Sequence, residues 1–232
     1  CDTDAIEAIA RKHGLRVIYD AAHAFGVRYN GKSLLGCGDL SAISFHATKV
    51  FNTFEGGAII CKDKTTKDRI ARLRNFGIRD ETSVEAVGLN GKLSEIHAAM
   101  GLLQLRHLAD ALEARRAIDR RYRAALGEIP GLACLACHPA SEPNHSYFPV
   151  LVGADYKLSR DGLHQKLKDA AIHARRYFYP LISNMTVYRD LPSAAADNLP
   201  VANRIADQVL CLPIYPGLTP EDQTRFIDIL RA

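Results

Sequence analysis

The chain has 232 residues, of which 47% are hydrophobic and 24% are charged. This balance is typical of a globular protein with a buried core, and it excludes disordered, collagenous and fibrous classes. The net charge of +4 is too small to indicate nucleic-acid binding by itself, and six cysteines are too few for a disulfide scaffold. We expect free thiols in a reducing cytoplasm, and no membrane span, because no apolar run approaches the ~18 residues required.

The first half of the sequence alternates helical and strand patterns. A helix is predicted from an acidic N-cap at Asp2 to a C-cap at Gly14. A helix needs a surface on which to pack, so we expect the natural chain to begin well upstream. Strands are predicted at 15–20, 42–45 and 57–61, which together indicate an α/β layer with a largely buried sheet.

A long helical pattern then runs from Ser94 to about Glu128, as one helix or two in tandem, closed by Gly127 and Pro130. Composition changes after this helix, so we place a domain boundary near its end and divide the chain into 1–127 and 128–232. The elements predicted for the second part are a loop at 139–143, a strand at 146–152, and helices at 159–170, 201–210 and 220–231.

Three reactive side chains lie close to the ends of the first two predicted strands. Asp20 ends the first strand, His23 follows it, and Lys49 comes just beyond the second. Open α/β sheets bind ligands at the carboxyl ends of their strands. A lysine in apolar surroundings is a nucleophile toward carbonyls, and a carboxylate beside a pyridine nitrogen keeps that nitrogen protonated. This combination is what pyridoxal 5′-phosphate requires.

The motifs around these residues resemble those of the DegT/DnrJ/EryC1/StrS aminotransferases, which are fold-type-I, pyridoxal-phosphate-dependent sugar aminotransferases. The resemblance extends in order over the whole chain. The segments that carry it are Asp20-Ala-Ala-His23-Ala24, Gly38-Asp-Leu-Ser41, Ser44-Phe-His-Ala-Thr-Lys49, Glu55-Gly-Gly-Ala58, Leu73-Arg-Asn-Phe-Gly77, Gly88-Leu-Asn-Gly-Lys-Leu-Ser-Glu-Ile-His-Ala-Ala99 and Leu210-Cys-Leu-Pro-Ile-Tyr-Pro216.

The resemblance implies a role for each of five residues. Lys49 matches the catalytic lysine that binds the cofactor covalently, and Asp20 matches the carboxylate that pairs with the pyridine nitrogen. His23 stands where the family has a Gln or His that contacts the cofactor. Ser44 matches a hydroxyl that binds the cofactor phosphate. Asn90 matches an Asn that reaches the phosphate in the neighbouring subunit, which implies a homodimer with shared active sites.

The resemblance also implies a fold. This is an α/β fold-type-I transferase in which 1–127 is the C-terminal part of the large cofactor-binding domain, with a mixed, mostly parallel sheet and the long linking helix. Residues 128–232 are expected to form a smaller α+β domain. The upstream part of the family chain, with its phosphate-binding turn and its ring-stacking aromatic residue, has no counterpart in this sequence.

Each predicted site residue has a structural alternative. A lysine is most often a solvated surface group. Asp20 could cap a turn between a strand and a helix, and His23 could be an ordinary core or turn histidine. Ser44 and Asn90 could serve backbone hydrogen bonds only.

Two other patterns in the sequence resemble binding sites for a metal ion or for phosphate groups. The pair Cys134/Cys137 with His138 hints at zinc, but a structural zinc site needs four ligands and no second pair occurs. An arginine cluster interleaves with acidic residues, which favours a solvated, ion-paired helix face over a phosphate or nucleic-acid patch. The cluster consists of Arg115, Arg116, Arg120, Arg121 and Arg123.

The sequence therefore predicts an enzyme that transfers an amino group from an amino acid, with glutamate favoured, to a nucleotide-linked keto-sugar. Dehydration of the sugar by the same fold is disfavoured, because that subgroup has a His in place of the Lys and Lys49 is intact. The alternative from another class is a catalytically inactive fragment or regulatory remnant of the family.

Overall fold

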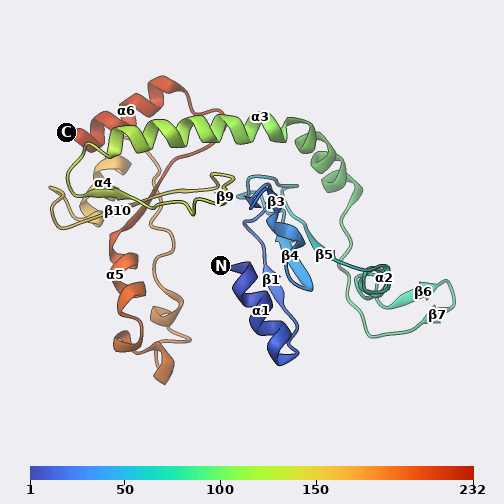
Figure 1. Cartoon of the computed structure of the whole chain (residues 1–232). Coiled ribbons are helices and arrows are strands. Elements are labelled where there is room, and N and C mark those ends of the chain that lie inside the picture. The colour runs from blue at the N-terminus through green and yellow to red at the C-terminus, as the bar shows by residue number, and fades with distance from the viewer. The chain divides into compact units, whose positions relative to one another are not determined.

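The computed structural model describes all 232 residues, which form two compact units (Figure 1). The first unit comprises Cys1–Asp110 with Pro139–Asn144, and the second comprises Ala111–His138 with His145–Ala232. The long helix α3 (Glu95–Leu126) is a single helix, as one of the two alternatives predicted. The units differ from the predicted division at 127/128 because the second half of α3 contributes buried side chains to the C-terminal core.

The first unit opens with α1 (Thr3–His13), and its predicted caps are confirmed. Asp2 accepts a hydrogen bond from the backbone N–H of Ala5 at 3.0 Å, and Gly14 takes a left-handed conformation with φ of 63°.

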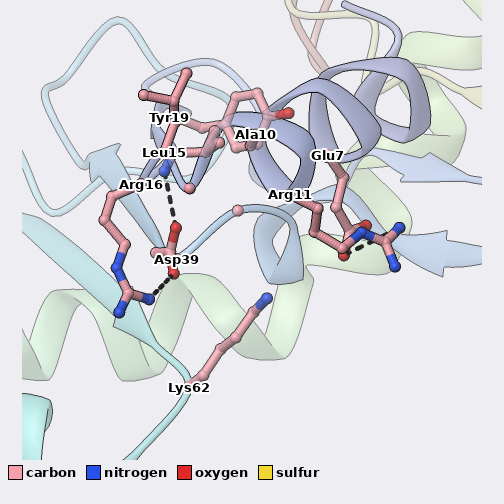
Figure 2. A pocket seen from close by; sticks show the side chains of 11 residues that line it. Glu7, Ala10, Arg11, Leu15, Arg16, Tyr19, Asp39 and Lys62 are labelled. Carbon is pink, nitrogen blue, oxygen red and sulfur yellow. Dashed lines mark hydrogen bonds and ion pairs between the residues drawn. The ribbon is translucent and has the colours of Figure 1, made fainter.

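Figure 2 shows the cavity beside α1, where the Asp39 carboxylate accepts hydrogen bonds from the Val17 N–H at 2.8 Å and from the Arg16 guanidinium at 2.9 Å. These bonds lower the pKa of Asp39, the backbone bond most.

A three-stranded sheet carries the predicted site. Its order is β1 (Ile18–Asp20), β4 (Leu40–Ser44) and β5 (Gly57–Cys61). β1 and β4 are parallel, and β4 and β5 are antiparallel. The predicted mixed sheet is therefore confirmed. Parallel pairing within this chain is confined to β1 and β4. The expectation of largely buried strands is wrong here: Ile18 is 67% exposed and Ile59 49%. The side chains of a strand point to the two faces of its sheet, and little packs on these faces at Ile18 and Ile59.

Smaller elements complete the first unit. They are β2 (Arg28–Tyr29), β3 (Lys32–Ser33), the 3-10 helix η1 (Leu34–Gly36), α2 (Lys64–Leu73), β6 (Ile78–Asp80), β7 (Ser83–Val84) and β9 (Ser141–Glu142). β9 lies in the segment predicted as a loop, and it becomes a strand because it pairs antiparallel with β2. This segment belongs to the first unit although it follows the long helix.

The second unit is an antiparallel sheet with helices. The strands are β11 (Val209–Leu212), β10 (Phe148–Val152) and β8 (Leu132–Cys134), in that order. Three α-helices, α4 (Arg160–Asp169), α5 (Pro200–Gln208) and α6 (Pro220–Arg231), confirm the predicted ones, although α5 ends two residues early. The sequence reasoning missed β11, all four residues of which are buried. The 3-10 helices η2 (Ile182–Asn184), η3 (Pro192–Ala194) and η4 (Ala196–Asn198) lie between α4 and α5.

The arginine cluster of α3 was predicted to form a solvated, ion-paired helix face, and only part of it does. The ion pairs are confirmed: Arg116 and Arg120 pair with Glu113, and Arg123 pairs with Asp119 at 2.7 Å. Arg115 instead is half-buried and donates to two backbone carbonyls, and its burial lowers its pKa.

Two further observations concern ligands and membranes. No group of three or more His, Cys, Asp or Glu side chains is placed to hold a metal ion. Among the helices, none is both long enough and apolar enough to span a bilayer.

Candidate active site

Lys49 lies in the loop that joins β4 to β5. Its backbone N–H donates to the carbonyl of His46 at 2.9 Å, which forms a turn. Two more backbone bonds of 2.9 Å close the loop, from Thr53 to the carbonyl of Phe45 and from Phe45 to the carbonyl of Gly56. The side chain of Lys49 is therefore carried by a segment that is fixed at both ends, and the residue is half-buried.

A glycine pair ends this loop for a steric reason. A Cβ at Gly57 would lie 2.7 Å from the carbonyl oxygen of Ile43, on the neighbouring strand. Gly56 has φ of +147°, a conformation that other residues rarely adopt, and a Cβ there would lie 2.7 Å from Thr53 Oγ1. The Gly-Gly step therefore lets β5 pair closely with β4 where the Lys49 loop ends.

Asp20 and His23 reach the same edge of the sheet from β1. Asp20 is the last residue of the strand, and its Oδ1 accepts a hydrogen bond from the N–H of Ala22 at 3.0 Å. The chain then turns, and His23 Nε2 lies 3.0 Å from Lys49 Nζ. The structure thus brings the predicted lysine and histidine into direct contact, and Asp20 is close enough to act on the imidazole electrostatically.

The contact with Lys49 defines the state of the imidazole. Burial lowers the pKa of His23 most, the nearby Lys49 ammonium lowers it further, and Asp20 opposes both effects. The neutral form of the ring is therefore favoured. An ammonium group can only donate, so Nε2 is the acceptor and we assign the ring proton to Nδ1.

Three aromatic rings hold the two loops of the site together. Phe25 stacks on Phe51 with ring centroids 4.3 Å apart, and Phe45 meets both rings edge-on at 6.0 and 4.9 Å. Phe45 and Phe51 bracket the turn that carries Lys49, whereas Phe25 follows His23 by two residues. Sequence reasoning missed this cluster, although aromatic residues on either side of a predicted site were a usable signal.

Ser44 and Asn90 make local hydrogen bonds in this structure. Ser44, the last residue of β4, accepts a bond from the N–H of His46 at 3.2 Å. Asn90 is exposed in the segment before α3, where its Oδ1 accepts a bond from Lys92 Nζ at 2.8 Å. Ser44 therefore lies at the same sheet edge as Asp20, while the role of Asn90 stays a prediction.

The side chains at this edge fit pyridoxal phosphate by their chemistry. The cofactor presents an aldehyde, a pyridine nitrogen and a phosphate. Lys49 offers an amine for the aldehyde, Asp20 offers a carboxylate with one oxygen beyond its turn bond, and Ser44 offers a hydroxyl. The α/β sheet thus presents, where β1 and β4 end, the kinds of groups that this cofactor needs.

Comparison with known proteins gives the family. The model of the DegT/DnrJ/EryC1/StrS aminotransferase family matches residues 1–231, and the chain belongs to this family. A dTDP-4-amino-4,6-dideoxy-D-glucose transaminase from Shigella dysenteriae is 48% identical over 231 residues, which cover 100% of this chain and 62% of the relative. The protein of the same name from Escherichia coli is also 48% identical, over 99% of this chain and 62% of its own length.

Solved structures agree with this result. DesV from S. venezuelae, determined in complex with a ketimine intermediate, has a TM-score of 0.90 and 32% identity. It is matched over 100% of this chain and 61% of its own. DesI, determined in the presence of its TDP-sugar product, has a TM-score of 0.90 and 36% identity, over 100% of this chain and 58% of its own. The chain thus spans about three-fifths of the length of these proteins.

The contact between Lys49 and His23 can be tested by titration. The substitution Lys49→Met removes the positive charge and the donor, so we expect the pKa of His23 to rise toward its ordinary value of about 6.5. The measurement is an NMR titration of the imidazole. Lys64→Met, at an exposed position on α2, is the matched control and should leave the titration unchanged. An equal shift in both variants would contradict a specific contact.

Proposed function

We propose that this protein is a pyridoxal-phosphate-dependent aminotransferase that moves an amino group from an amino acid, glutamate in our proposal, to a nucleotide-linked keto-sugar in the cytoplasm. The observation that supports this most is the 3.0 Å contact between Lys49 Nζ and His23 Nε2 at the edge where β1 and β4 end. It orients a primary amine at the place where an α/β sheet binds its ligand.

The residues would divide the work as follows. When bound, pyridoxal phosphate supplies a carbonyl for amines and a ring that withdraws electrons from the reacting carbon. Lys49 Nζ would hold the cofactor and would carry a proton from the donor α-carbon as general base and acid. Asp20 would keep the proton on the pyridine nitrogen, His23 would orient the lysine, and Ser44 would bind the phosphate.

The relatives suggest the sugar. Two proteins named dTDP-4-amino-4,6-dideoxy-D-glucose transaminase are 48% identical to this chain, whereas a dTDP-3-amino-3,4,6-trideoxy-alpha-D-glucose transaminase from Streptomyces venezuelae is 32% identical. We therefore propose a dTDP-linked keto-sugar that receives its amino group at C4. The nucleotide would supply binding energy remote from the reacting carbon.

We further propose a homodimer in which Asn90 binds the cofactor phosphate of the partner. In support, Asn90 is exposed and lies in a segment with apolar side chains that are also exposed: Val84 by 70%, Val87 by 99% and Leu89 by 64%. An exposed apolar cluster beside a polar donor is typical of an interaction surface.

The first test concerns Lys49. Lys49→Ala removes the amine, and Lys49→Arg replaces it with a guanidinium that stays protonated, so we expect both variants to lose transamination and keep their fold. Transamination is measured with glutamate and the dTDP-keto-sugar, and folding by circular dichroism. The visible absorbance acquired with pyridoxal phosphate should also be lost. A folded wild-type chain that acquires no absorbance would support the inactive remnant instead.

Asp20 is tested by a change that keeps its shape. Asp20→Asn can still accept the turn bond from the N–H of Ala22, so a residue that only caps the turn would tolerate it. A residue that holds the pyridine proton would not, and we expect the turnover rate to fall by about two orders of magnitude. A rate within a few-fold of wild type would reduce Asp20 to a turn cap.

If each active site contains Lys49 from one chain and Asn90 from its partner, variants of these two residues should complement each other in a mixed dimer. Asn90→Ala should weaken cofactor binding without unfolding the chain, and mixing it with inactive Lys49→Ala should restore activity, because one site of each mixed dimer has both residues intact. The measurement is turnover after subunit exchange, confirmed by differently tagged chains. A mixture that exchanges subunits but stays inactive would place Asn90 outside the partner's site.

A further inference from the structure

A side chain distant in sequence holds the turn that carries His23. The Asn144 Nδ2 group donates one hydrogen bond to the carbonyl of His23 at 2.8 Å and another to the carbonyl of Phe25 at 2.9 Å. Both acceptors are carbonyl oxygens, so only the NH₂ end of the amide can face them. Asn144 is only 6% exposed, and buried bonds of this kind are costly to break.

These two bonds add to the backbone hydrogen bonds that close the turn. Within the turn, Ala24 donates to the carbonyl of Ala21 at 2.9 Å, and Val27 donates to that of Ala24 at 3.0 Å. The carbonyls of His23 and Phe25 are the ones that Asn144 takes. The amide therefore spans the residue that contacts Lys49 and the residue that stacks on Phe51.

The position of Asn144 is itself fixed by strand pairing. β9 pairs with β2, with Ser141 opposite Tyr29 and Glu142 opposite Arg28. The N–H of Asn30 also donates to the carbonyl of Ala140 at 2.9 Å. Asn144 follows β9 by two residues, so its amide arrives at the turn from a short, hydrogen-bonded strand rather than from a free loop.

We propose that Asn144 is a positioning residue of the active site, which sets the imidazole of His23 against Lys49 Nζ by clamping the carbonyls on either side of the turn. The expected effect of Asn144 on turnover rests on the proposed function. Its effect on the position of His23 does not depend on that function. Without the clamp, the imidazole is free to move toward solvent and away from the ammonium group.

The test is an NMR titration of His23 in the full chain without cofactor. Lys49 and Asp20 both act electrostatically on His23, and the variants Asn144→Ala and Asn144→Leu add no charge of their own. We expect the pKa of His23 to rise toward about 6.5 in both variants.

Two controls separate positioning from a general loss of structure. Asn203→Ala removes an amide that also donates to two carbonyls, those of Ala196 and Leu199, and Glu142→Gln alters β9 without touching the clamp. Both should leave the titration of His23 unchanged. An unchanged pKa of His23 in the Asn144 variants, a shift of equal size in either control variant, or failure of both Asn144 variants to fold would overturn the proposal.

Turnover provides an independent reading. We expect Asn144→Ala to lower kcat on the order of 10-fold or more with little change in KM, because a displaced amine affects the chemical step more than substrate binding. If the wild-type chain shows no transamination while His23 still shifts in the Asn144 variants, the proposed function fails and the positioning role stands.

Discussion

The candidate site depends on the register of two parallel strands. Asp20 lies opposite Ala42, so β1 ends two residues before β4 ends at Ser44. Side chains alternate between the faces of a strand, so a slip of one residue would send Asp20 to the opposite face, away from the loop of Lys49. The carboxylate and the amine can serve one ligand only in the observed register.

Three sets of contacts then fix the positions of the Lys49 loop and of the turn that carries His23. The glycines at 56 and 57 allow β5 to pair closely with β4 where the Lys49 loop ends. Contacts among Phe25, Phe45 and Phe51 join that loop to the turn after β1, and Asn144 holds the turn from β9. No single one of them places Lys49 Nζ 3.0 Å from His23 Nε2. Sites that act on small reactive groups need such over-determination, because errors of about 1 Å in position can cost 100-fold in rate.

The sequence predicted local features far better than burial and pairing. Caps at Asp2 and Gly14, the helix through Ser94–Glu128 and the strand at 57–61 follow from propensity and periodicity. The exposure of Ile18 could not be predicted, because it depends on what packs against β1 in three dimensions. β11 was missed because Val209–Leu212 continues the apolar pattern of α5, and periodicity cannot separate a short buried strand from the end of a helix.

Within the candidate site, too, residues beside local elements were predictable and residues placed by long-range pairing were not. Lys49 and Asp20 could be found from strand ends and from the resemblance, because each lies next to a recognisable element. Asn144 could not, since it is more than 110 residues from the turn it holds and no local pattern marks an amide that bridges two carbonyls. Only the pairing of β9 with β2, itself invisible in a segment predicted as a loop, brings it there.

The neutral state of His23 connects this geometry to pH. A protonated imidazole has no acceptor nitrogen, so below its pKa the ring could no longer accept a bond from Lys49 and the two cations would repel each other. The pKa of His23 is lowered in the folded chain, so the folded state binds fewer protons than the unfolded state in the interval below about 6.5. The folded chain is therefore more stable above that interval, and it loses stability as the pH falls through it and the imidazole is protonated. Burial, which favours the neutral ring most, and the nearby ammonium act in the same direction, and Asp20 opposes them only in part. The site is therefore built so that its histidine accepts a hydrogen bond at neutral pH, the state in which it can orient a lysine amine.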